Sequence, residues 1–248
     1  MTASLLRWYE REARDLPWRR THDPWAILVS EVMLQQTQAA RVVPYYERFL
    51  ARFPDPAACA AAPAAEALRA WSGLGYNRRA LALHRTATIV ARDGWPADLV
   101  ALPGVGPYTA AAVASFAFGA AVLAVDVNVR RVLARSEIAV GEPTPELNQA
   151  LMELGATVCT ARAPRCSACP LAEGCDGPGE PTARAAARPR FEDTDRFVRG
   201  RVVAALAAGE PLPDVDASRL QRALRGLERD GLIERSEGRF RLPGDALG

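Results

Sequence analysis

The chain has 248 residues, of which 49% are hydrophobic, so it can bury a core in one large domain or two modest ones. Its formal net charge of +2 excludes a strongly basic global field, so any nucleic-acid affinity must come from local faces. No apolar run reaches membrane-spanning length and no signal-peptide pattern opens the sequence, so we expect a cytoplasmic protein with no membrane partner. Helix formers dominate, and we predict a mostly α-helical protein.

The basic residues have one unusual property, because all 31 are arginine and none is lysine. A Schiff-base mechanism needs an amine that can lose its proton, and arginine cannot supply one. Only the α-amino group is left for such chemistry.

The N-terminal region is predicted to form an amphipathic helix around residues 5–9, then a turn at residues 16–20. Asp23-Pro24 is typical of a helix N-cap and first helical residue, and the following PWAILVSEVMLQQ is apolar nearly all round, which indicates a buried helix. Glu31 lies in this helix. Burial should raise its pKa so that it holds a proton near neutral pH, as a general acid must. A structural ion pair with an arginine explains it equally well.

Residues 35–38, QQTQ, are polar and end this helix, either as caps or as groups that reach base edges. Two further helices are expected at residues 42–53 and 64–71, joined by a Pro- and Ala-rich link in which Cys59 is a small buried hydrophobe. The Gly-rich turn at residues 72–77 either anchors its leucine and tyrosine in the core or wedges them between stacked bases. The helix at residues 77–93 is expected to point Arg78, Arg79 and Arg85 outward, and Gly94 ends it.

A short helix is predicted to end near Leu102, and a Pro-Gly-Val-Gly turn connects it to a second helix within residues 102–126. Free amides at such a turn favour an anion and suit a DNA strand held by its backbone, although a tight turn between packed helices is the simpler alternative. Asp126 begins the next helix as its N-cap, where amide donors keep a carboxylate ionised. A protonated Glu31 and an ionised Asp126 would suit cleavage of a glycosidic bond through an oxocarbenium-like transition state, although capping alone also explains Asp126.

Four of the five cysteines form the pattern C-x6-C-x2-C-x5-C, namely Cys159, Cys166, Cys169 and Cys175. In a cytoplasmic chain this spacing indicates metal ligation rather than disulfides. The rules for thiolate ligands leave zinc and an iron–sulfur cluster equally open.

Together these motifs resemble the helix-hairpin-helix (HhH-GPD) superfamily of DNA glycosylases, and within it the MutY-type adenine glycosylases, over residues 1 to about 178. The resemblance rests on LPWR (16–19), SEVMLQQTQ (30–38), WSGLGY (71–76), LPGVGPYTAAAV (102–113), VDVNVRRVLAR (125–135), LNQALMELGATVC (147–159) and the cysteine loop (159–175). It implies an all-α helix-hairpin-helix glycosylase fold with a [4Fe–4S] cluster on that loop. It also implies a monomeric, monofunctional base excision repair enzyme that hydrolyses the N-glycosidic bond of adenine opposite 8-oxoguanine or G in double-stranded DNA.

The resemblance assigns roles to individual positions. Glu31 would protonate adenine and Asp126 would face the sugar cation, with Tyr108, where lyase relatives carry lysine, and Asn128 supporting the pair. The positions that match the base pocket are Arg14, Leu16, Trp18, Arg19, Gln149 and Met152. The positions that match DNA contacts are Leu34, Gln36, Thr37, Leu74, Tyr76, Gly104, Val105 and Gly106.

The sequence departs from the family pattern in three places. Val127 replaces the usual glycine after the catalytic aspartate, the segment 136–147 is shorter by about a helix or more, and the C-terminal NUDIX-like module that helps to recognise 8-oxoguanine is missing. We therefore predict a glycosylase domain at residues 1–178, a linker at 179–190 and a small appendage at 191–248.

The appendage is predicted to contain helices at residues 197–208 and 218–230, with Gly231 as C-cap, and a hairpin turning at Glu237-Gly238. This order is similar to a winged helix, which could add DNA contacts. A structural or partner-binding appendage is the alternative, because its acidic residues oppose a phosphate-facing role.

Two other functions stay open on sequence alone. One is a MutY relative retuned to another mismatched or damaged base, such as thymine in a G·T pair. The other is an inactive DNA-binding relative, although binding alone needs neither Glu31 nor Asp126. In each case we expect a cytoplasmic protein that associates with the nucleoid when on DNA.

Overall fold

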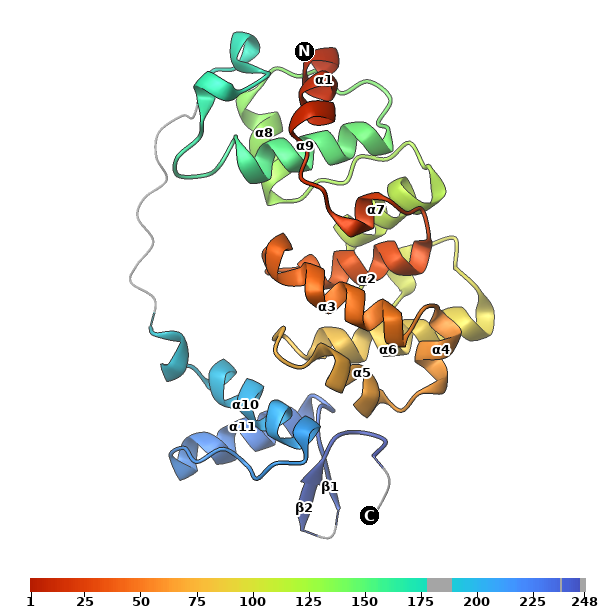
Figure 1. The fold of residues 1–248 in the computed structure, drawn as a ribbon, viewed down its shortest axis with the longest axis vertical. Coiled ribbons are helices and arrows are strands. Elements are labelled where there is room, and N and C mark those ends of the chain that lie inside the picture. The colour runs from red at the N-terminus through yellow and green to blue at the C-terminus, as the bar shows by residue number, and fades with distance from the viewer. Residues whose placement is uncertain (178–188, 237, 246–248) are drawn as a thin grey trace. The chain divides into compact units, whose positions relative to one another are not determined.

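The computed structural model describes residues 1–177, 189–236 and 238–245, and it is mainly helical, as predicted (Figure 1). The α-helices are α1 (Thr2–Glu12), α2 (Pro24–Leu34), α3 (Ala39–Arg52), α4 (Pro56–Ala61), α5 (Ala64–Trp71), α6 (Arg78–Asp93), α7 (Pro107–Phe118), α8 (Val127–Arg135), α9 (Pro145–Thr157), α10 (Asp195–Ala208) and α11 (Ala217–Arg229). Short 3-10 turns lie at Pro17–Arg19, Leu99–Ala101, Cys166–Ala168, Ala172–Gly174 and Phe191–Asp193. Strands β1 (Glu234–Ser236) and β2 (Arg239–Arg241) complete the described structure.

The chain divides into two compact units that alternate along the sequence. The first unit comprises residues 1–31 and 105–185, and the second comprises residues 32–104 and 186–248. The predicted linker, residues 179–190, lies almost entirely outside the described residues. The predicted division into residues 1–178 and 191–248 therefore stays a prediction.

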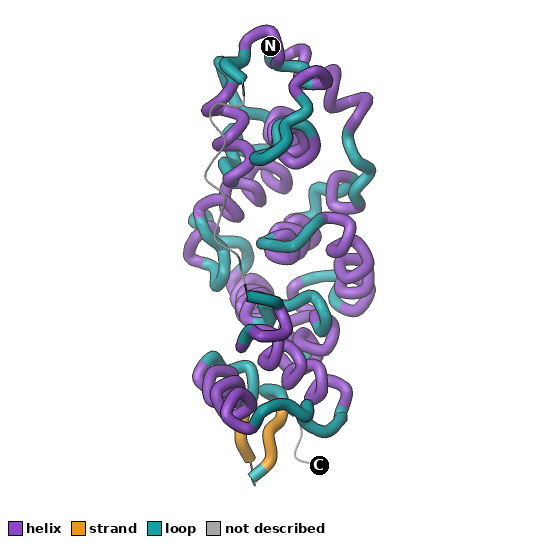
Figure 2. Tube along the Cα trace, turned by 90° about the vertical axis from the view of Figure 1, so that its left-hand side faces the viewer, coloured by secondary structure: helices purple, strands orange, loops and turns teal. Residues whose placement is uncertain are grey.

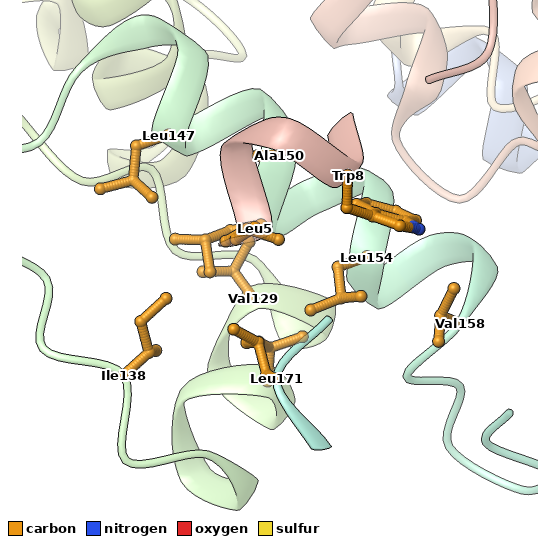
Figure 3. Close-up of a cluster of buried hydrophobic side chains, with 11 residues drawn as sticks. Leu5, Trp8, Val129, Ile138, Leu147, Ala150, Leu154, Val158 and Leu171 are labelled. Carbon is orange, nitrogen blue, oxygen red and sulfur yellow. The ribbon is translucent and has the colours of Figure 1, made fainter. Parts of the chain in front are cut away.

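The core of the first unit forms where α1, α8 and α9 meet (Figure 3). Leu5 from α1, Val129 from α8 and Leu154 from α9 are completely buried there. Ile138, from the shortened connection between α8 and α9, and Leu171, from the cysteine loop, pack into the same cluster. Burying a leucine side chain contributes about 1.5–3 kcal/mol. Both the short connection and the cysteine loop are thus held by the core.

The second unit packs α3, α4, α5 and α6 together. Phe49 lies at its centre, with ring centroids 5.0 Å from Phe53 and 6.1 Å from Trp71. The predicted Pro- and Ala-rich link contains a helix, α4, so the expectation of a plain link is wrong. Asp55 caps α4 by accepting a hydrogen bond from the Ala58 amide (2.7 Å), which is the Asp-Pro signal already recognised before α2.

The C-terminal segment, residues 191–245, belongs to the second unit and consists of α10, α11 and the hairpin β1–β2. Figure 2 shows these strands in orange, the only strands in the described residues. Their antiparallel register places Ser236 opposite Arg239, which confirms the predicted hairpin. Residue 237 lies outside the described part of the chain.

No helix within the described ranges combines the length and apolar character that a membrane span requires.

Candidate active site

Asp126 occupies the N-cap of α8, as predicted. Its Oδ1 accepts hydrogen bonds from the main-chain amides of Asn128 (2.8 Å) and Val129 (2.7 Å), and its Oδ2 accepts one from Asn128 Nδ2 (2.8 Å). These donors and the helix N-terminus stabilise negative charge on the carboxylate. Since a carboxylate offers about four lone-pair sites, capacity remains to face a cation.

Asn128 is fixed from two sides. Its Oδ1 accepts a hydrogen bond from Arg131 Nη2 (2.8 Å) while its Nδ2 donates to Asp126. Helix α9 approaches it closely, because a Cβ added to Gly155 would lie only 2.9 Å from the Asn128 Cβ. A side chain at position 155 would displace Asn128, so glycine leaves room for Asn128 beside Asp126.

Glu31 is almost completely buried, with 5% of its surface exposed. Its pKa is raised to about 7, mainly by burial; a hydrogen bond from Tyr108 opposes this rise and the nearby charge of Asp126 adds to it. Its Oε2 has no hydrogen-bond partner among the described residues, and none of the ion pairs found there includes Glu31. The structure therefore favours a proton-holding acid over an ion pair with arginine.

Tyr108 projects from the first turn of α7 and lies beside Glu31. Its hydroxyl interacts with Glu31 and lies 3.8 Å from Met152 Sδ. Burial, followed by the charges of Glu31 and Asp126, raises the pKa of Tyr108 far above its ordinary value. The phenol therefore stays neutral and able to donate.

A buried carboxylate organises the residues predicted to line the base pocket. Glu153 on α9 accepts hydrogen bonds from Arg14 Nε (2.7 Å) and Nη2 (2.9 Å) and from Arg19 Nη2 (2.7 Å). Burial favours a raised pKa for Glu153, but the hydrogen bonds from the two arginines outweigh it and the pKa is lowered. One helical turn earlier, Gln149 Oε1 accepts from the Tyr9 hydroxyl, and the Arg19 guanidinium lies 5.4 Å from the Tyr9 ring centroid.

The remaining predicted pocket residues are apolar. Leu16 and Trp18 are buried in and beside the 3-10 turn at residues 17–19, and Met152 contacts Tyr108. The structure thus connects Arg14, Arg19 and Gln149 through polar contacts and links Met152 directly to Tyr108.

The glycine turn before α7 has the expected backbone. Gly104 adopts φ +77°, and a Cβ there would lie 2.7 Å from Ala82 Cβ, so the position requires glycine. Val105 is buried, and Gly106 is the N-cap of α7, which begins at Pro107 and has no side-chain cap. The first amides of α7 are therefore not satisfied by a capping side chain, as suits a helix end that receives a phosphate.

In the second unit, Arg79 joins the Gly-rich turn to the end of α2. Its Nη1 donates to the carbonyls of Val32 (2.8 Å), Met33 (3.0 Å) and Gln35 (2.6 Å), and its Nη2 donates to Gly75 O (3.1 Å). The prediction that Arg79 points outward is therefore wrong, because the last carbonyls of a helix need donors. Burial lowers the pKa of Arg79 to about 10, so it is still charged at neutral pH.

The residues predicted to probe DNA differ in exposure. Gln36 and Tyr76 are exposed and are the only non-glycine residues in the described ranges with positive φ, +58° and +51°. Leu34 and Thr37 are half-buried, and Thr37 Oγ1 lies 3.5 Å from Arg79 Nη2. Leu74 is buried, so it would have to leave the core to enter a base stack. Tyr76 is the aromatic group that this turn presents to solvent.

The four predicted cysteine ligands surround one cavity in the first unit. Its volume is about 70 Å³, and Cys159, Cys166, Cys169 and Cys175 all line it together with Arg135. Within the described residues no three acidic, histidine or cysteine side chains converge tightly enough to hold a single metal ion. Four thiols around a shared space fit a polynuclear iron–sulfur cluster, whose natural ligands are thiolates.

Arginines and main-chain pairing hold this loop to α8. Arg135 Nη1 donates to Thr160 O (3.0 Å) and lies 3.6 Å from Cys159 Sγ. At the other end of the loop, Ser136 forms an isolated antiparallel β-bridge with Cys175. The main-chain amide of Gly177 lies 3.4 Å from the Sγ of Cys175. Donors to sulfur are the contacts that tune an iron–sulfur site.

Sequence reasoning missed Glu153 and Arg131, which hold the predicted site residues. The available signal for Glu153 was a charged residue one turn after Gln149 on an otherwise apolar face of α9. Arg131 lies one turn after Asn128, a spacing that allows side chains on one helix to meet. Neither pattern reveals the distant partner.

The fold and the two carboxyl groups are those of a known class of base excision DNA repair proteins. Residues 29–156 match the family described as HhH-GPD superfamily base excision DNA repair protein. Residues 159–175 match the iron–sulfur binding domain of endonuclease III, so the cysteine loop is an iron–sulfur site. The solved structure of a thermostable thymine-DNA glycosylase superposes with a TM-score of 0.65 and 29% identity, covering 71% of this chain and 94% of that one.

Curated relatives narrow this class. Adenine DNA glycosylase of Mycobacterium tuberculosis (strain H37Rv) is 46% identical over 288 positions, which cover 98% of this chain and 94% of the relative. The Mycolicibacterium smegmatis enzyme of the same name is 44% identical, covering 97% of this chain and 95% of the relative. This protein therefore belongs to the adenine DNA glycosylase family. Because 288 aligned positions exceed the 248 residues of the chain, the M. tuberculosis relative carries segments that are absent here.

One further relative agrees with this assignment, and one further solved structure agrees with the fold. Human adenine DNA glycosylase is 41% identical over 69% of this chain and 38% of that protein. A trapped endonuclease III–DNA covalent intermediate matches in fold, with a TM-score of 0.60 over 70% of this chain and 24% identity.

Proposed function

We propose that this adenine DNA glycosylase hydrolyses the N-glycosidic bond of adenine paired with 8-oxoguanine or guanine in double-stranded DNA, and that it does not cleave the strand. The observation that carries the proposal is the buried acid Glu31, with its pKa raised to about 7, beside Tyr108 and the charge of Asp126. The relatives named adenine DNA glycosylase support the choice of base.

In the proposed reaction, Glu31 donates its proton to the adenine ring nitrogen. The glycosidic C–N bond then breaks with its electron pair leaving on the base, and an oxocarbenium-like sugar cation forms. Asp126, held by three hydrogen bonds, faces this cation as an oriented anion. Water adds to the sugar and its proton returns to the ionised Glu31, so the products are free adenine and an abasic site.

The lack of lysine supports hydrolysis without strand cleavage. A lyase step requires an amine that forms an imine with the opened sugar. Tyr108 supplies a neutral hydroxyl where lyase relatives carry that amine. The strand that carries the abasic site is therefore released without being cleaved.

Three groups of residues are proposed to contact the DNA. The amides at the start of α7 receive a backbone phosphate, and Arg14, Leu16, Trp18, Arg19, Gln149 and Met152 surround the flipped adenine. Gln36, Thr37 and Tyr76 contact the opposite strand, with Leu34 and Leu74 behind them. When bound, the [4Fe–4S] cluster would cross-link Cys159, Cys166, Cys169 and Cys175 and give the loop a fixed shape.

A second candidate is removal of thymine from a G·T pair. The similarity to a solved thymine-DNA glycosylase, at a TM-score of 0.65, favours testing it. Greater identity to the mycobacterial relatives, over nearly the whole chain, makes adenine the first choice.

A single-turnover assay separates these possibilities. The substrates are duplexes with A opposite 8-oxoguanine, A opposite G, T opposite G, and 5-hydroxyuracil opposite G, with enzyme in excess. We expect adenine release to be fastest opposite 8-oxoguanine and to be abolished in Glu31→Gln, whereas Glu10→Gln, an exposed glutamate on α1, should behave as wild type. Release of thymine or 5-hydroxyuracil in preference to adenine, or tight binding without release of any base, would overturn the proposal.

A further inference from the structure

The C-terminal segment (residues 191–245) contacts the turn that carries Tyr76. Arg196, in the first turn of α10, donates a hydrogen bond to the Tyr76 hydroxyl, and its guanidinium lies 4.9 Å from the centroid of the Tyr76 ring. Both residues belong to the second unit, although 120 positions separate them. Arg79 also contacts the ring, at 5.1 Å. Tyr76 is therefore held by two arginines, one of which comes from the C-terminal segment.

The main chain of Tyr76 is held in one conformation. Its φ of +51° is unfavourable for an aromatic residue, and such a conformation persists only where neighbours impose it. Here Trp71 Nε1 (2.9 Å) and Arg79 Nη2 (3.1 Å) both donate to Gly75 O. These bonds hold the peptide group that precedes Tyr76. With the main chain held, the direction of the ring depends on what its exposed side contacts, and Arg196 makes that contact.

Arg196 is itself supported by its surroundings. Its guanidinium lies 5.0 Å from the Phe191 ring centroid, and Phe191 in turn packs edge-on against Phe197 at 5.6 Å. Thr194 caps α10 by accepting a hydrogen bond from the Phe197 amide. The arginine that reaches Tyr76 thus projects from a capped helix end backed by two aromatic rings.

The C-terminal segment is anchored to α5 of the same unit, which fixes Arg196 relative to the turn. Arg69 Nη2 donates to both carboxylate oxygens of Asp245, at 2.8 and 2.9 Å, and Arg69 Nε donates to Ala207 O (3.3 Å). The Ala65 amide donates to Pro243 O (2.9 Å). Helix α10 also packs against α5.

The surface formed here combines aromatic rings with arginine side chains. Tyr76, Phe191, Arg190 and Arg196 are exposed, with Phe191 at 49% and Tyr76 at 36%. Aromatic side chains stack on bases, and arginines contact phosphates and ring faces. This chemistry matches a DNA strand with a disturbed base stack.

We propose that Arg196 positions the Tyr76 ring for reading the base opposite the target adenine, so that the C-terminal segment contributes a specificity-determining contact. The inference rests on the proposed function, because it assigns Tyr76 to the strand opposite the excised base. Arg196 is a positioning residue: it acts through Tyr76 rather than on the reacting atoms. Residues 191–245 thus contribute to the discrimination between 8-oxoguanine and guanine.

The test measures binding, so that it does not depend on turnover. Duplexes carry 2′-fluoro-deoxyadenosine, whose fluorine destabilises the sugar cation and blocks cleavage, opposite either 8-oxoguanine or guanine. Dissociation constants are measured at several salt concentrations for wild type, Arg196→Ala, Tyr76→Phe and the double variant. Arg225→Ala, an exposed arginine on α11 of the same segment, is the matched control. Thermal unfolding checks that every variant folds.

We expect Arg196→Ala to lose about tenfold of the preference for 8-oxoguanine over guanine, the size of loss expected for one hydrogen bond and one cation–π contact. Tyr76→Phe, which keeps the ring and removes the hydroxyl, should lose part of the preference. The double variant should lose less than the sum of the two changes, because they break one shared contact. Arg225→Ala should keep the wild-type preference.

Three results would overturn the inference. These are an unchanged preference in Arg196→Ala, a wild type without any preference, and equal weakening of both duplexes with a salt slope shallower by about one, as a plain phosphate contact gives. Adenine release by wild type from the normal substrate is assayed in parallel. Failure of that release would contradict the proposed function, whereas the binding preference alone decides the role of Arg196.

Discussion

Arg131 Nε donates a hydrogen bond to the main-chain carbonyl of Cys159, 2.8 Å away. The same guanidinium donates to Gly155 O (2.8 Å) and to Asn128 Oδ1 (2.8 Å). Since Asn128 in turn donates to Asp126, one arginine connects the Asp126 carboxylate to the first cysteine of the iron–sulfur loop.

Replacing Arg131 with alanine should therefore damage two sites at once. Three hydrogen bonds from a charged group are lost, and we expect destabilisation of about 3 kcal/mol or more. Cluster content, measured as iron per chain and visible absorbance, should fall together with the rate of base release. Arg130→Ala removes the same charge from an exposed neighbouring position on α8 and should change neither quantity. An Arg131→Ala protein with full cluster content and full rate would show that the connection has no effect.

The pH dependence of the reaction should follow the protonation of Glu31. Because burial raises its pKa to about 7, the carboxyl is protonated below that pH and loses its proton above it. The single-turnover rate should therefore fall above about pH 7, approaching tenfold per pH unit. Rapid-quench measurements between roughly pH 5 and pH 9, the span over which such a group titrates, give this profile. A rate that rises through neutral pH would instead identify Glu31 as a base.

The same group should make stability depend on pH. Its pKa lies at 4.5 without the protein environment and at about 7 in the folded protein, so the folded state binds the proton more tightly. The stabilisation is complete below the unfolded pKa and is lost as the pH rises through the folded pKa. A shift of this size corresponds to about 3 kcal/mol.

Urea unfolding of Glu31→Gln provides the measurement. Above neutral pH the variant should be more stable than wild type by about 2–3 kcal/mol, because it no longer buries a charge. The difference should shrink as the pH falls toward the unfolded pKa. Glu10→Gln, at an exposed position, should show no such trend, and an equal effect in the two variants would contradict burial as the cause.

Glu153 should show the opposite dependence on pH. Its pKa is lowered by the hydrogen bonds from Arg14 and Arg19, so its contribution to stability is present above its ordinary pKa and is lost as the pH falls through the folded value. Removing one partner of a buried pair costs about 3–5 kcal/mol, and the partial exposure of Arg14 places the expected loss at the lower end.

For Glu153→Gln, we expect a loss of about 3 kcal/mol at neutral pH, narrowing in acid, together with weaker binding of duplexes that carry the cleavage-resistant adenine. Glu146→Gln, an exposed glutamate on α9, is the matched control. If Glu153→Gln unfolds at the same urea concentration as wild type at neutral pH, the buried pair does not stabilise the first unit.

Much of the fold and the site was predictable from local patterns. Asp126 as N-cap, the glycine turn, the C-terminal hairpin and the burial of Glu31 each follow from a few neighbouring residues, because capping, positive φ and helical periodicity are short-range effects. Helix α4 was missed although Asp55-Pro56 carried the same kind of signal.

The chemical groups of this protein were evident from its sequence: two carboxyl groups, four thiols, no lysine and a glycine turn. How these groups are held depends on contacts between distant residues, namely Glu153 with Arg14 and Arg19, Arg131 with Cys159, and Arg196 with Tyr76. Arg131 and Cys159 are 28 residues apart, and Arg14 and Glu153 are 139 apart. Arginine is abundant throughout the chain, so the choice of partner depends on which helices pack together, and that packing is set by the whole core rather than by any local pattern.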